Sequence, residues 1–295
     1  MTAPVPTVTV VIAARNAAAT LGDQLDALER QSFDGPFEVV VVDNGSTDGT
    51  AALVAARAGG AVGVRCIDAP DGRGPAYGRN IGVAQSDGEL LAFCDADDVV
   101  TVGWLENLVE AADGADLIAG PLRFASALNS PEALAWYGYG PDAVFAPGTR
   151  VTGGLLPHAA GANMAAWRRT LAEVGGFDEG AVCVEDKEIS WRMQLAGYRL
   201  AFAPGAVVDY RLRGSLGGFA RQQFQYGRME ALLYRSFHDE GLARRPPGVV
   251  ARSWALTLLT APTVVEPRRR GRWVRRVARD AGRLRGSVDQ RCWVL

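Results

Sequence analysis

The sequence predicts an α/β protein with a doubly wound, mostly parallel sheet, and three observations support this. Apolar strand patterns alternate with helical patterns through the first 120 residues. The strand patterns carry valine, isoleucine and leucine at consecutive positions, as is typical of parallel strands that are covered on both faces. Two of these strands end in aspartate, and ligands of such sheets bind beyond the carboxyl ends of the strands.

The elements are expected in the following order. Residues 7–13 (TVTVVIA) form the first strand, and Leu21, Leu25 and Leu28 give the next segment the spacing of a helix. An apolar strand (FEVVVVDNG) comes next, and a Ser-Thr-Asp start signal precedes the helical segment GTAALVAARAGG. The alternation continues with a strand at 64–68, a helix at 76–84, a strand at 89–95, a helix at 102–112 and a strand at 116–120.

The second half of the chain is less regular. Residues 126–157 are rich in glycine, proline and aromatic residues, so we expect an irregular loop of the kind that often covers a substrate. A further helix begins near residue 185, and its side chains expected to point mostly inward are Ile189, Trp191, Met193 and Leu195.

Composition indicates an intracellular globular protein. At 295 residues, 48% hydrophobic and 22% charged, the chain can bury a large core as one big domain, with or without an appendage. Its four cysteines lie far apart without a CxxC pair, which argues against a zinc site or a disulfide framework. The N-terminal MTAPVPTVTVVIAARN lacks a basic region and predicts a core strand, not a signal peptide. We therefore expect a cytoplasmic protein.

The net charge of −2 conceals an uneven distribution. Residues 241–295 contain 13 arginines against Glu266, Asp280 and Asp289, which gives +10 and leaves −12 for the remainder. An acidic body with a basic tail predicts two kinds of partner, one held through a metal ion and one anionic surface. A tail that is simply solvated is the alternative.

The stretch LLAFCDADDVV places Asp95, Asp97 and Asp98 at the end of an apolar strand. Like charges so close raise one another's pKa, so folding alone gives no reason to gather them. A divalent cation that bridges to a phosphate would give one, and Mg²⁺ or Mn²⁺ prefers oxygen ligands. A surface acidic turn is the alternative.

Two other segments have the chemistry of a nucleotide site. Asp43 ends the strand in VVVVDNGSTDGT, where its carboxylate could accept hydrogen bonds from a base or ribose or could merely cap the turn. Arg73 and Arg79 stand among glycines in DGRGPAYGRNIG, and guanidinium groups on flexible backbone suit a diphosphate.

Glu185 and Asp186 begin the helix in VEDKEISWRMQL. The positive end of the helix dipole tolerates negative charge there, and a carboxylate fixed beside a pocket could act as a general base toward a hydroxyl. Ordinary capping of the helix is the alternative.

With these segments in this order, the chain resembles the family 2 glycosyltransferases, which have the Rossmann-like GT-A fold. The resemblance covers roughly residues 5–235. The matching stretches are VTVVIAARNAAATL, VVVVDNGSTDGT, GPAYGRNIGVAQSDGELLAFCDADD, GANMAAWRRTLAEVGGFDE and EDKEISWRMQLAGYRLAFAPGAVV.

The resemblance implies roles for particular residues. Asp43 is similar to the residue that holds the base, and Asp95 and Asp97 match the DxD pair, with Asp98 adjacent. The residues that it implies at the donor are Ala14, Asn16, Asp43, Arg73, Arg79, Asn80, Asp95 and Ala96. On the acceptor side it implies Gly161, Ala162, Asn163 and Trp191. The implied ligands of Mg²⁺ or Mn²⁺ are Asp97 and Asp98, with Asp209 as a further candidate.

Asp186 matches the catalytic base of an inverting transfer, with Glu185 beside it. Such an enzyme displaces the nucleoside diphosphate directly, while the base takes the proton of the acceptor hydroxyl. The chain departs from the pattern at Tyr210, where many relatives place a histidine that helps bind the metal or diphosphate. Asp209 is the residue that could substitute for this histidine.

The tail predicts a membrane surface as the second partner. The segment VVARSWALTLLTAPTVV is shorter than the about 20 residues that span a bilayer. In RRRGRWVRRVARDAGRLRG, Trp273, Val274 and Val277 stand among arginines, which is typical of an amphipathic helix lying on anionic lipid. No nucleic-acid recognition module accompanies the charge, so nucleic acid is not expected.

Taken together, we expect a catalytic domain at 1–240 and a basic tail at 241–295. The domain divides into a nucleotide-sugar-binding half (1–122) and an acceptor half (123–240). The expected activity is inverting transfer of a sugar to a glycan, glycolipid or lipid-linked acceptor at the inner membrane face. The alternatives are a degenerate scaffold protein at the membrane and a phosphohydrolase, whose DxDx[TV] motif fits CDADDVV but normally closes the first strand of its domain.

Overall fold

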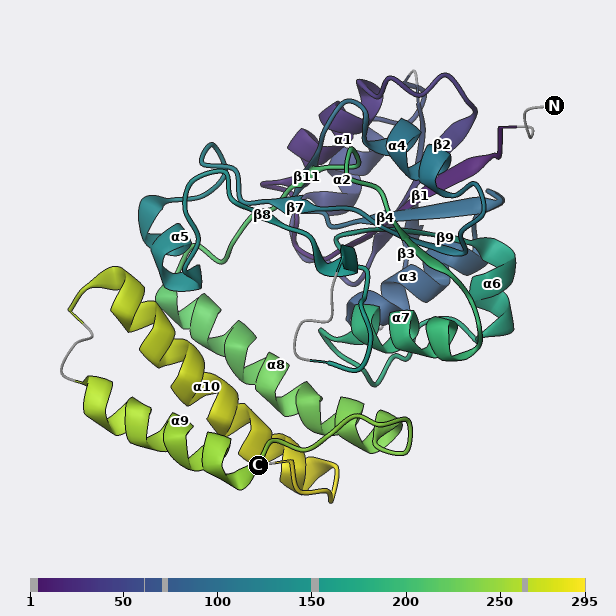
Figure 1. The fold of residues 1–295 in the computed structure, drawn as a ribbon. Helices are drawn as coiled ribbons and strands as arrows, with labels where there is room; N and C mark the ends of the chain where they lie inside the picture. Colours follow the sequence, from purple (N-terminus) through teal and green to yellow (C-terminus); the bar gives the residue numbers. More distant parts are fainter. Residues whose placement is uncertain (1–4, 61, 71–73, 150–153, 262–264, 295) are drawn as a thin grey trace. The chain divides into compact units, whose positions relative to one another are not determined.

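The computed structural model of the protein describes residues 5–60, 62–70, 74–149, 154–261 and 265–294 (Figure 1). The chain divides into two compact units. The first unit comprises residues 1–123, 144–180 and 185–210, and the second comprises 124–143, 181–184 and 211–295. The functional division into a donor half, an acceptor half and a tail stays a prediction.

The first unit is built on a seven-stranded sheet with the strand order β10-β6-β9-β4-β1-β2-β3. All neighbouring strands run parallel except the pairs that β9 makes with β4 and β6. The predicted mixed α/β fold with a mostly parallel sheet is therefore confirmed. The strands are β1 (Val8–Ala14), β2 (Phe37–Asp43), β3 (Gly63–Asp68), β4 (Leu90–Cys94), β6 (Leu117–Ala119), β9 (Asn163–Trp167) and β10 (Leu200–Phe202).

Helices cover both faces of this sheet because its central strands are apolar on both sides. Val10 and Ile12 of β1 lie in the core that receives α1 (Leu21–Glu29), α2 (Thr50–Ala55) and α4 (Trp104–Ala111). Val11 of β1 and Phe93 of β4 lie in the opposite core. That second core receives α3 (Pro75–Ala84), α6 (Arg168–Glu173) and α7 (Glu185–Leu195). Each fully buried valine or leucine contributes about 1.5–3 kcal/mol, so these two cores hold the strand ends in place.

A small second sheet, in the order β5-β11-β7-β8, belongs to the first unit. Its strands are β5 (Val99–Val100), β11 (Val208–Asp209), β7 (Leu122–Arg123) and β8 (Val144–Phe145). β5 directly follows the aspartates Asp95, Asp97 and Asp98, and its backbone is paired with β11. The sheet therefore fixes the far end of the acidic turn.

Residues 126–157 are more regular than the sequence predicts. They contain the helix α5 (Pro131–Tyr137), β8 and the short 3₁₀-helix η1 (Pro147–Thr149), while residues 150–153 lie outside the described residues. Local signals start α5, since the side chain of Ser130 accepts a hydrogen bond from the backbone of Ala133 and Pro131 occupies the first helical turn. The prediction of an irregular loop is therefore wrong for the residues that form α5, β8 and η1.

The inward residues of α7 follow the prediction except at one position. Ile189, Trp191 and Met193 are buried, whereas Leu195 is exposed. Leu195 is the last residue of the helix, where the chain leaves the buried part of α7.

The second unit contains three further helices, α8 (Leu216–Phe237), α9 (Pro247–Thr260) and α10 (Pro267–Asp289). In Figure 1 the yellow α10 lies between α8 and α9. The backbones of α8 and α10 come unusually close, because a Cβ added at Gly282 or Gly286 would lie 2.1 Å from a carbonyl oxygen of α8. Glycine is thus what permits this close packing.

Replacing Gly282 by alanine is expected to destabilise the second unit, because the new Cβ would press on the carbonyl oxygen of Phe224 and separate the two helices. Overpacking of this kind typically costs about 1–3 kcal/mol. Hydrogen exchange of the α8 amides measures this loss as a fall in the opening free energy.

Gly248→Ala in α9 is the matched control, since its added Cβ would meet nothing within 4 Å beyond the neighbouring backbone of its own helix. Alanine favours the helix more than glycine does, so protection should stay unchanged or rise slightly in the control. Equal losses of protection in the two variants would contradict the close packing.

Candidate active site

The carboxyl ends of β1 and β2 form one side of the candidate site. Ala14 and Asp43 are the last residues of these strands and are paired in the sheet. Asp43 is buried, and its Oδ1 accepts a hydrogen bond from the backbone N–H of Ser46 at 2.9 Å. The carboxylate that the sequence assigns to the base therefore also caps the turn that follows β2.

Asn16 ties the loop after β1 to the loop after β2. Its Oδ1 accepts a hydrogen bond from the N–H of Thr47 at 2.8 Å, and its own N–H donates to Ser46 Oγ at 2.9 Å. Asn16 has φ 52°, a left-handed conformation that asparagine tolerates better than most residues do. Two of the expected donor-side residues, Asn16 and Asp43, thus converge on the same turn.

The acidic turn after β4 has the geometry of a metal site. Asp95, Asp97 and Asp98 each offer a carboxylate oxygen, and these oxygens lie within 4.8 Å of one another. Three carboxylates on one short turn form the hard oxygen donor set that Mg²⁺ and Mn²⁺ accept alongside phosphate oxygens and water. These residues therefore fit a divalent cation.

The further metal candidate, Asp209, lies in a different environment. It forms an ion pair with Arg123, whose Nη2 donates to Asp209 Oδ2 at 2.7 Å. The cluster of described carboxylates that could hold a metal contains Asp95, Asp97 and Asp98, and Asp209 is not a member of it.

Helix α1 supports the acidic turn through residues that the sequence analysis missed. Buried Gln24 donates from Nε2 to the carbonyl of Asp95 at 3.3 Å and accepts at Oε1 from the N–H of Val100 at 2.9 Å. Thr20 donates from Oγ1 to the carbonyl of Ala96 at 3.1 Å. The available signal was a polar glutamine among the inward leucines of an amphipathic helix.

Arg79 of α3 lies at the centre of the site. Its side chain is only 3% exposed, with Nη2 donating to Asp95 Oδ1 at 2.9 Å and Nη1 donating to Glu185 Oε1 at 2.6 Å. A Cβ at Gly161 would lie 2.9 Å from the guanidinium, so glycine leaves room for it. One buried cation therefore joins the acidic turn to the start of α7.

Glu185 and Asp186 differ sharply in environment. Glu185 is 5% exposed, and burial raises its pKa to about 7 against the opposing effect of Arg79, with the charge of Asp186 raising it further. Asp186 is half-buried, and its Oδ2 accepts a hydrogen bond from the N–H of Gly161 at 3.1 Å while Oδ1 accepts from the N–H of Lys187 at 2.7 Å. Asp186 is thus the more accessible carboxylate of the two and is held in a fixed orientation.

Other predicted site residues have internal partners. Asn80 makes hydrogen bonds with both the N–H and the carbonyl of Phe177, each at 2.9 Å. Asn163 is fully buried, accepting from the indole of Trp104 at 2.8 Å and donating to the carbonyls of Pro121 and Ala206 at 2.8 and 2.7 Å. These side chains brace the loops around the site, and their contact with donor or acceptor stays a prediction.

The remaining expected residues divide into three groups. Trp191 is buried, and its indole donates to the carbonyl of Leu156 at 2.8 Å. Ala96 and Ala162 are also buried. Arg73 lies outside the described residues. The structure thus brings Arg79, Asp95, Gly161, Glu185 and Asp186 together through direct contacts.

Residues 9–175 match the sequence profile of the family described as Glycosyl transferase family 2. This segment is more than half of the 295-residue chain. The chain therefore belongs to glycosyltransferase family 2, as the resemblance of its motifs predicts.

Two relatives illustrate the similarity. The chain is 29% identical over 262 residues to a pre-mycofactocin glycosyltransferase of Mycobacterium tuberculosis, with 84% of this chain and 52% of the relative covered. It is 28% identical over 231 residues to glycosyltransferase AglE of Haloferax volcanii, with 77% and 74% covered. The chain thus spans about half the length of the mycobacterial relative.

Solved structures show the same fold. The mannosyltransferase PcManGT from Pyrobaculum calidifontis, in complex with GDP-Man and Mn²⁺, superposes with a TM-score of 0.65 at 20% identity, over 97% of this chain and 88% of that one. TarS 1–349 from S. aureus, in complex with UDP-GlcNAc, gives a TM-score of 0.56 at 20% identity, over 77% and 66%. The predicted GT-A fold is confirmed.

The raised pKa of Glu185 predicts a pH dependence of stability. The unfolded chain loses the Glu185 proton near pH 4.5, whereas the folded protein keeps it to about pH 7. Because the unfolded state binds fewer protons between these values, stability falls as pH rises from about 4.5 to 7, by roughly 3 kcal/mol for this group.

Glu185→Gln should remove this contribution. Urea unfolding of metal-free protein at pH 5 and pH 7.5 compares the two forms, and the free energy of the variant should fall less than that of the wild type. Glu173→Gln, at a carboxyl in α6 whose Oε2 accepts from Tyr198, serves as the control. If the variant loses as much unfolding free energy between pH 5 and pH 7.5 as the wild type, Glu185 is ionised over this whole pH range and the prediction is wrong.

Proposed function

We propose that the protein is an inverting glycosyltransferase that moves a sugar from a nucleotide-sugar donor to a hydroxyl group in the presence of Mg²⁺ or Mn²⁺. The observation that supports this most strongly is the direct link, through Arg79, between the acidic turn and the carboxylates at the start of α7. A donor diphosphate and an acceptor hydroxyl must meet within a few ångströms, and this link keeps their two binding groups side by side.

At the donor end, Asp97 and Asp98 would hold the cation beside Asp95. The ion, when bound, neutralises charge on the leaving diphosphate. Asp43 would accept a hydrogen bond from the base or ribose, and Ala14, Asn16, Arg79, Asn80 and Ala96 would complete the donor site together with Arg73. Family membership and the three clustered carboxylates support this assignment.

At the acceptor end, Asp186 would take the proton of the attacking hydroxyl. Its half-exposed carboxylate is oriented by the N–H of Gly161, as a general base requires. Glu185, with its raised pKa, would limit the negative charge beside Asp186 and Asp95. One direct displacement on the side opposite the diphosphate inverts the anomeric configuration.

The acceptor class is proposed as a glycan, glycolipid or lipid-linked molecule, bound by the half of the chain that contains Gly161, Ala162, Asn163 and Trp191. Relatives support a place in glycan assembly. The succinoglycan biosynthesis protein ExoU of Rhizobium meliloti is 36% identical over 134 residues, covering 45% of this chain and 38% of that protein.

We also propose that the enzyme works at the cytoplasmic face of the cell membrane, held there by the basic region 241–295. Among the described residues, none of the helices combines the length and apolar composition needed to cross a bilayer. The net charge of +10 in this region supports attachment to an anionic surface.

A scaffold protein that has lost donor binding is the second candidate. It is favoured by Tyr210 at the position of the usual histidine and by the pairing of Asp209 with Arg123, which leaves neither residue as an evident replacement ligand. Metal-dependent nucleotide binding separates this candidate from the enzyme.

Two single substitutions test the assignment. Asp186→Asn should reduce sugar transfer by at least about a hundredfold, the usual contribution of a general base, while leaving nucleotide binding intact. Asp97→Asn should abolish the binding itself. Thermal shifts with UDP, GDP, dTDP and CMP, each with and without Mn²⁺, identify the donor class and measure binding, and donor hydrolysis or transfer measures turnover.

Asp34→Asn, an exposed carboxylate of the first unit, is the control for both substitutions. A wild type that gains no stability from any nucleotide and metal would favour the scaffold. Loss of nucleotide binding by Asp186→Asn would mean that this residue holds the structure and is not the base.

A further inference from the structure

Positive charge on α10 is neutralised mainly near the C-terminus of the helix, whereas at its start one ion pair joins Arg269 to Glu266, with Nε 3.4 Å from Oε2. The helix carries nine arginines and two aspartates. Near its C-terminus Arg283 pairs with Glu230 and Asp280, and Arg285 pairs with Asp289. Closer to its N-terminus, Arg272 has no hydrogen-bond or ion-pair partner among the described residues. The unbalanced charge therefore gathers in the first half of the helix.

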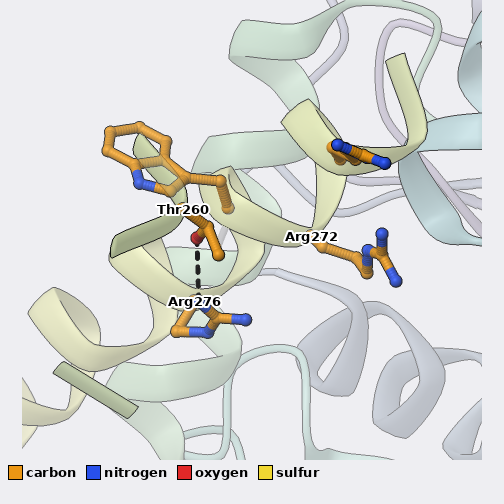
Figure 2. A pocket seen from close by; sticks show the side chains of 5 residues that line it. Thr260, Arg272 and Arg276 are labelled. Atoms are coloured by element: carbon orange, nitrogen blue, oxygen red, sulfur yellow. Dashed lines mark hydrogen bonds between the residues drawn. The ribbon is translucent and has the colours of Figure 1, made fainter. Parts of the chain in front are cut away.

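This charge lines a pocket between α9 and α10. The pocket has a volume of about 330 Å³ and is lined by Thr260, Arg269, Arg272, Trp273 and Arg276. Figure 2 shows Arg276 donating to Thr260, with Nη1 3.3 Å from Oγ1. A second pocket, of about 280 Å³, shares Arg272 and Arg276 and adds Arg275, Arg279 and Arg283.

The walls of the pocket are held in place by the second unit itself. The indole N–H of Trp273 donates to the carbonyl of Thr257 at 2.9 Å, which joins α10 to α9. Arg275 lies over the ring of Phe219, 5.8 Å from its centroid, and its pKa is lowered by burial and by the charge of Arg279. Arg275 and Arg279 line the second pocket, which shares Arg272 and Arg276 with the first, so an anion bound there would relieve the repulsion between their charges.

Apolar side chains are exposed at the end of α9, next to the pocket along the chain. Leu258 and Leu259 are 75% and 74% exposed and immediately precede Thr260. Val265, just before α10, is 81% exposed. Single exposed leucines are ordinary, but adjacent ones beside an arginine pocket form the combination that interfacial membrane segments use.

The geometry points to a binding site for the phosphate of an anionic phospholipid. We propose that Arg269, Arg272 and Arg276 bind the headgroup phosphate while Leu258 and Leu259 enter the boundary between headgroups and acyl chains. The inference rests on the proposed membrane attachment and does not depend on the transferase chemistry. It also replaces the expected mode of contact, because Trp273, Val274 and Val277 of α10 are half-buried within the unit.

The leucines favour a lipid over a nucleic acid as the source of the phosphate. A single-stranded nucleic acid would stack its bases on exposed aromatic rings among the arginines, whereas Trp273, the aromatic residue that lines this pocket, is half-buried and hydrogen-bonded to α9. Adjacent exposed leucines would give a nucleic acid no benefit. They gain free energy only on leaving water.

The test is sedimentation of the full chain with phosphatidylcholine vesicles that contain either about 30% phosphatidylglycerol or none. The total amount of lipid is the same in both samples. The wild type should bind the anionic vesicles and be released by salt. Arg272→Ala/Arg276→Ala should weaken binding about thirtyfold, as expected for two arginines worth about 1 kcal/mol each near the surface. Leu258→Ser/Leu259→Ser should weaken it at least about tenfold.

Arg30→Ala/Arg169→Ala is the matched control, since it removes the same charge from exposed positions of the first unit and should bind like the wild type. Equal weakening by both arginine pairs, or none by either, would overturn the pocket as the site. Wild type that binds neither kind of vesicle would overturn membrane attachment itself. If Leu258→Ser/Leu259→Ser still binds the vesicles, and the protein binds single-stranded RNA with equal affinity, the pocket is a site for polyanions. That result would overturn the proposed phospholipid site. Nucleotide binding with Mn²⁺, measured on the same samples, shows separately whether the donor site is intact.

Discussion

The arrangement of the site depends on one buried guanidinium. Arg79 contacts Asp95 on the turn after β4 and Glu185 at the start of α7, so a single side chain joins two segments that approach from different elements. Burying a charge is costly unless it is paired, and here two carboxylates and the ring of Phe177 compensate it. Since Gly161 leaves space for this group and also orients Asp186, the same few residues set both ends of the site.

The sheet explains why acidic residues can gather at this edge. Parallel strands deliver their carboxyl ends to one side, and the loops after β1, β2 and β4 are cross-linked by Asn16, Gln24 and Thr20. The resulting cost of like charges is met partly by Arg79 and partly by the raised pKa of Glu185. A divalent cation would compensate the remaining negative charge and could in turn bind the diphosphate of a nucleotide sugar.

The parallel sheet and the acidic cluster could be predicted from the sequence because short local patterns of residues encode them. Consecutive apolar residues identified the buried parallel strands, and the aspartates after β4 identified the acidic cluster. The inward turn of Arg79 could not be predicted, since its partner Glu185 lies 106 positions away and no local pattern encodes that pair. Asn163, expected beside the acceptor, is a fully buried hydrogen-bonding residue, and a motif alone does not distinguish a side chain that lines a site from one that braces it.

A double-mutant cycle on Arg79 and Glu185 tests the central claim most directly, with the free energy of unfolding as the measured quantity. Removing one partner of a buried ion pair typically costs about 3–5 kcal/mol, so at a pH above the Glu185 pKa of about 7, where this carboxylate is ionised, Arg79→Met alone should be strongly destabilising. Adding Glu185→Gln to that variant should recover part of the loss, which gives a coupling energy of more than about 1 kcal/mol. Strictly additive effects would contradict the claim that this guanidinium holds the two halves of the site together.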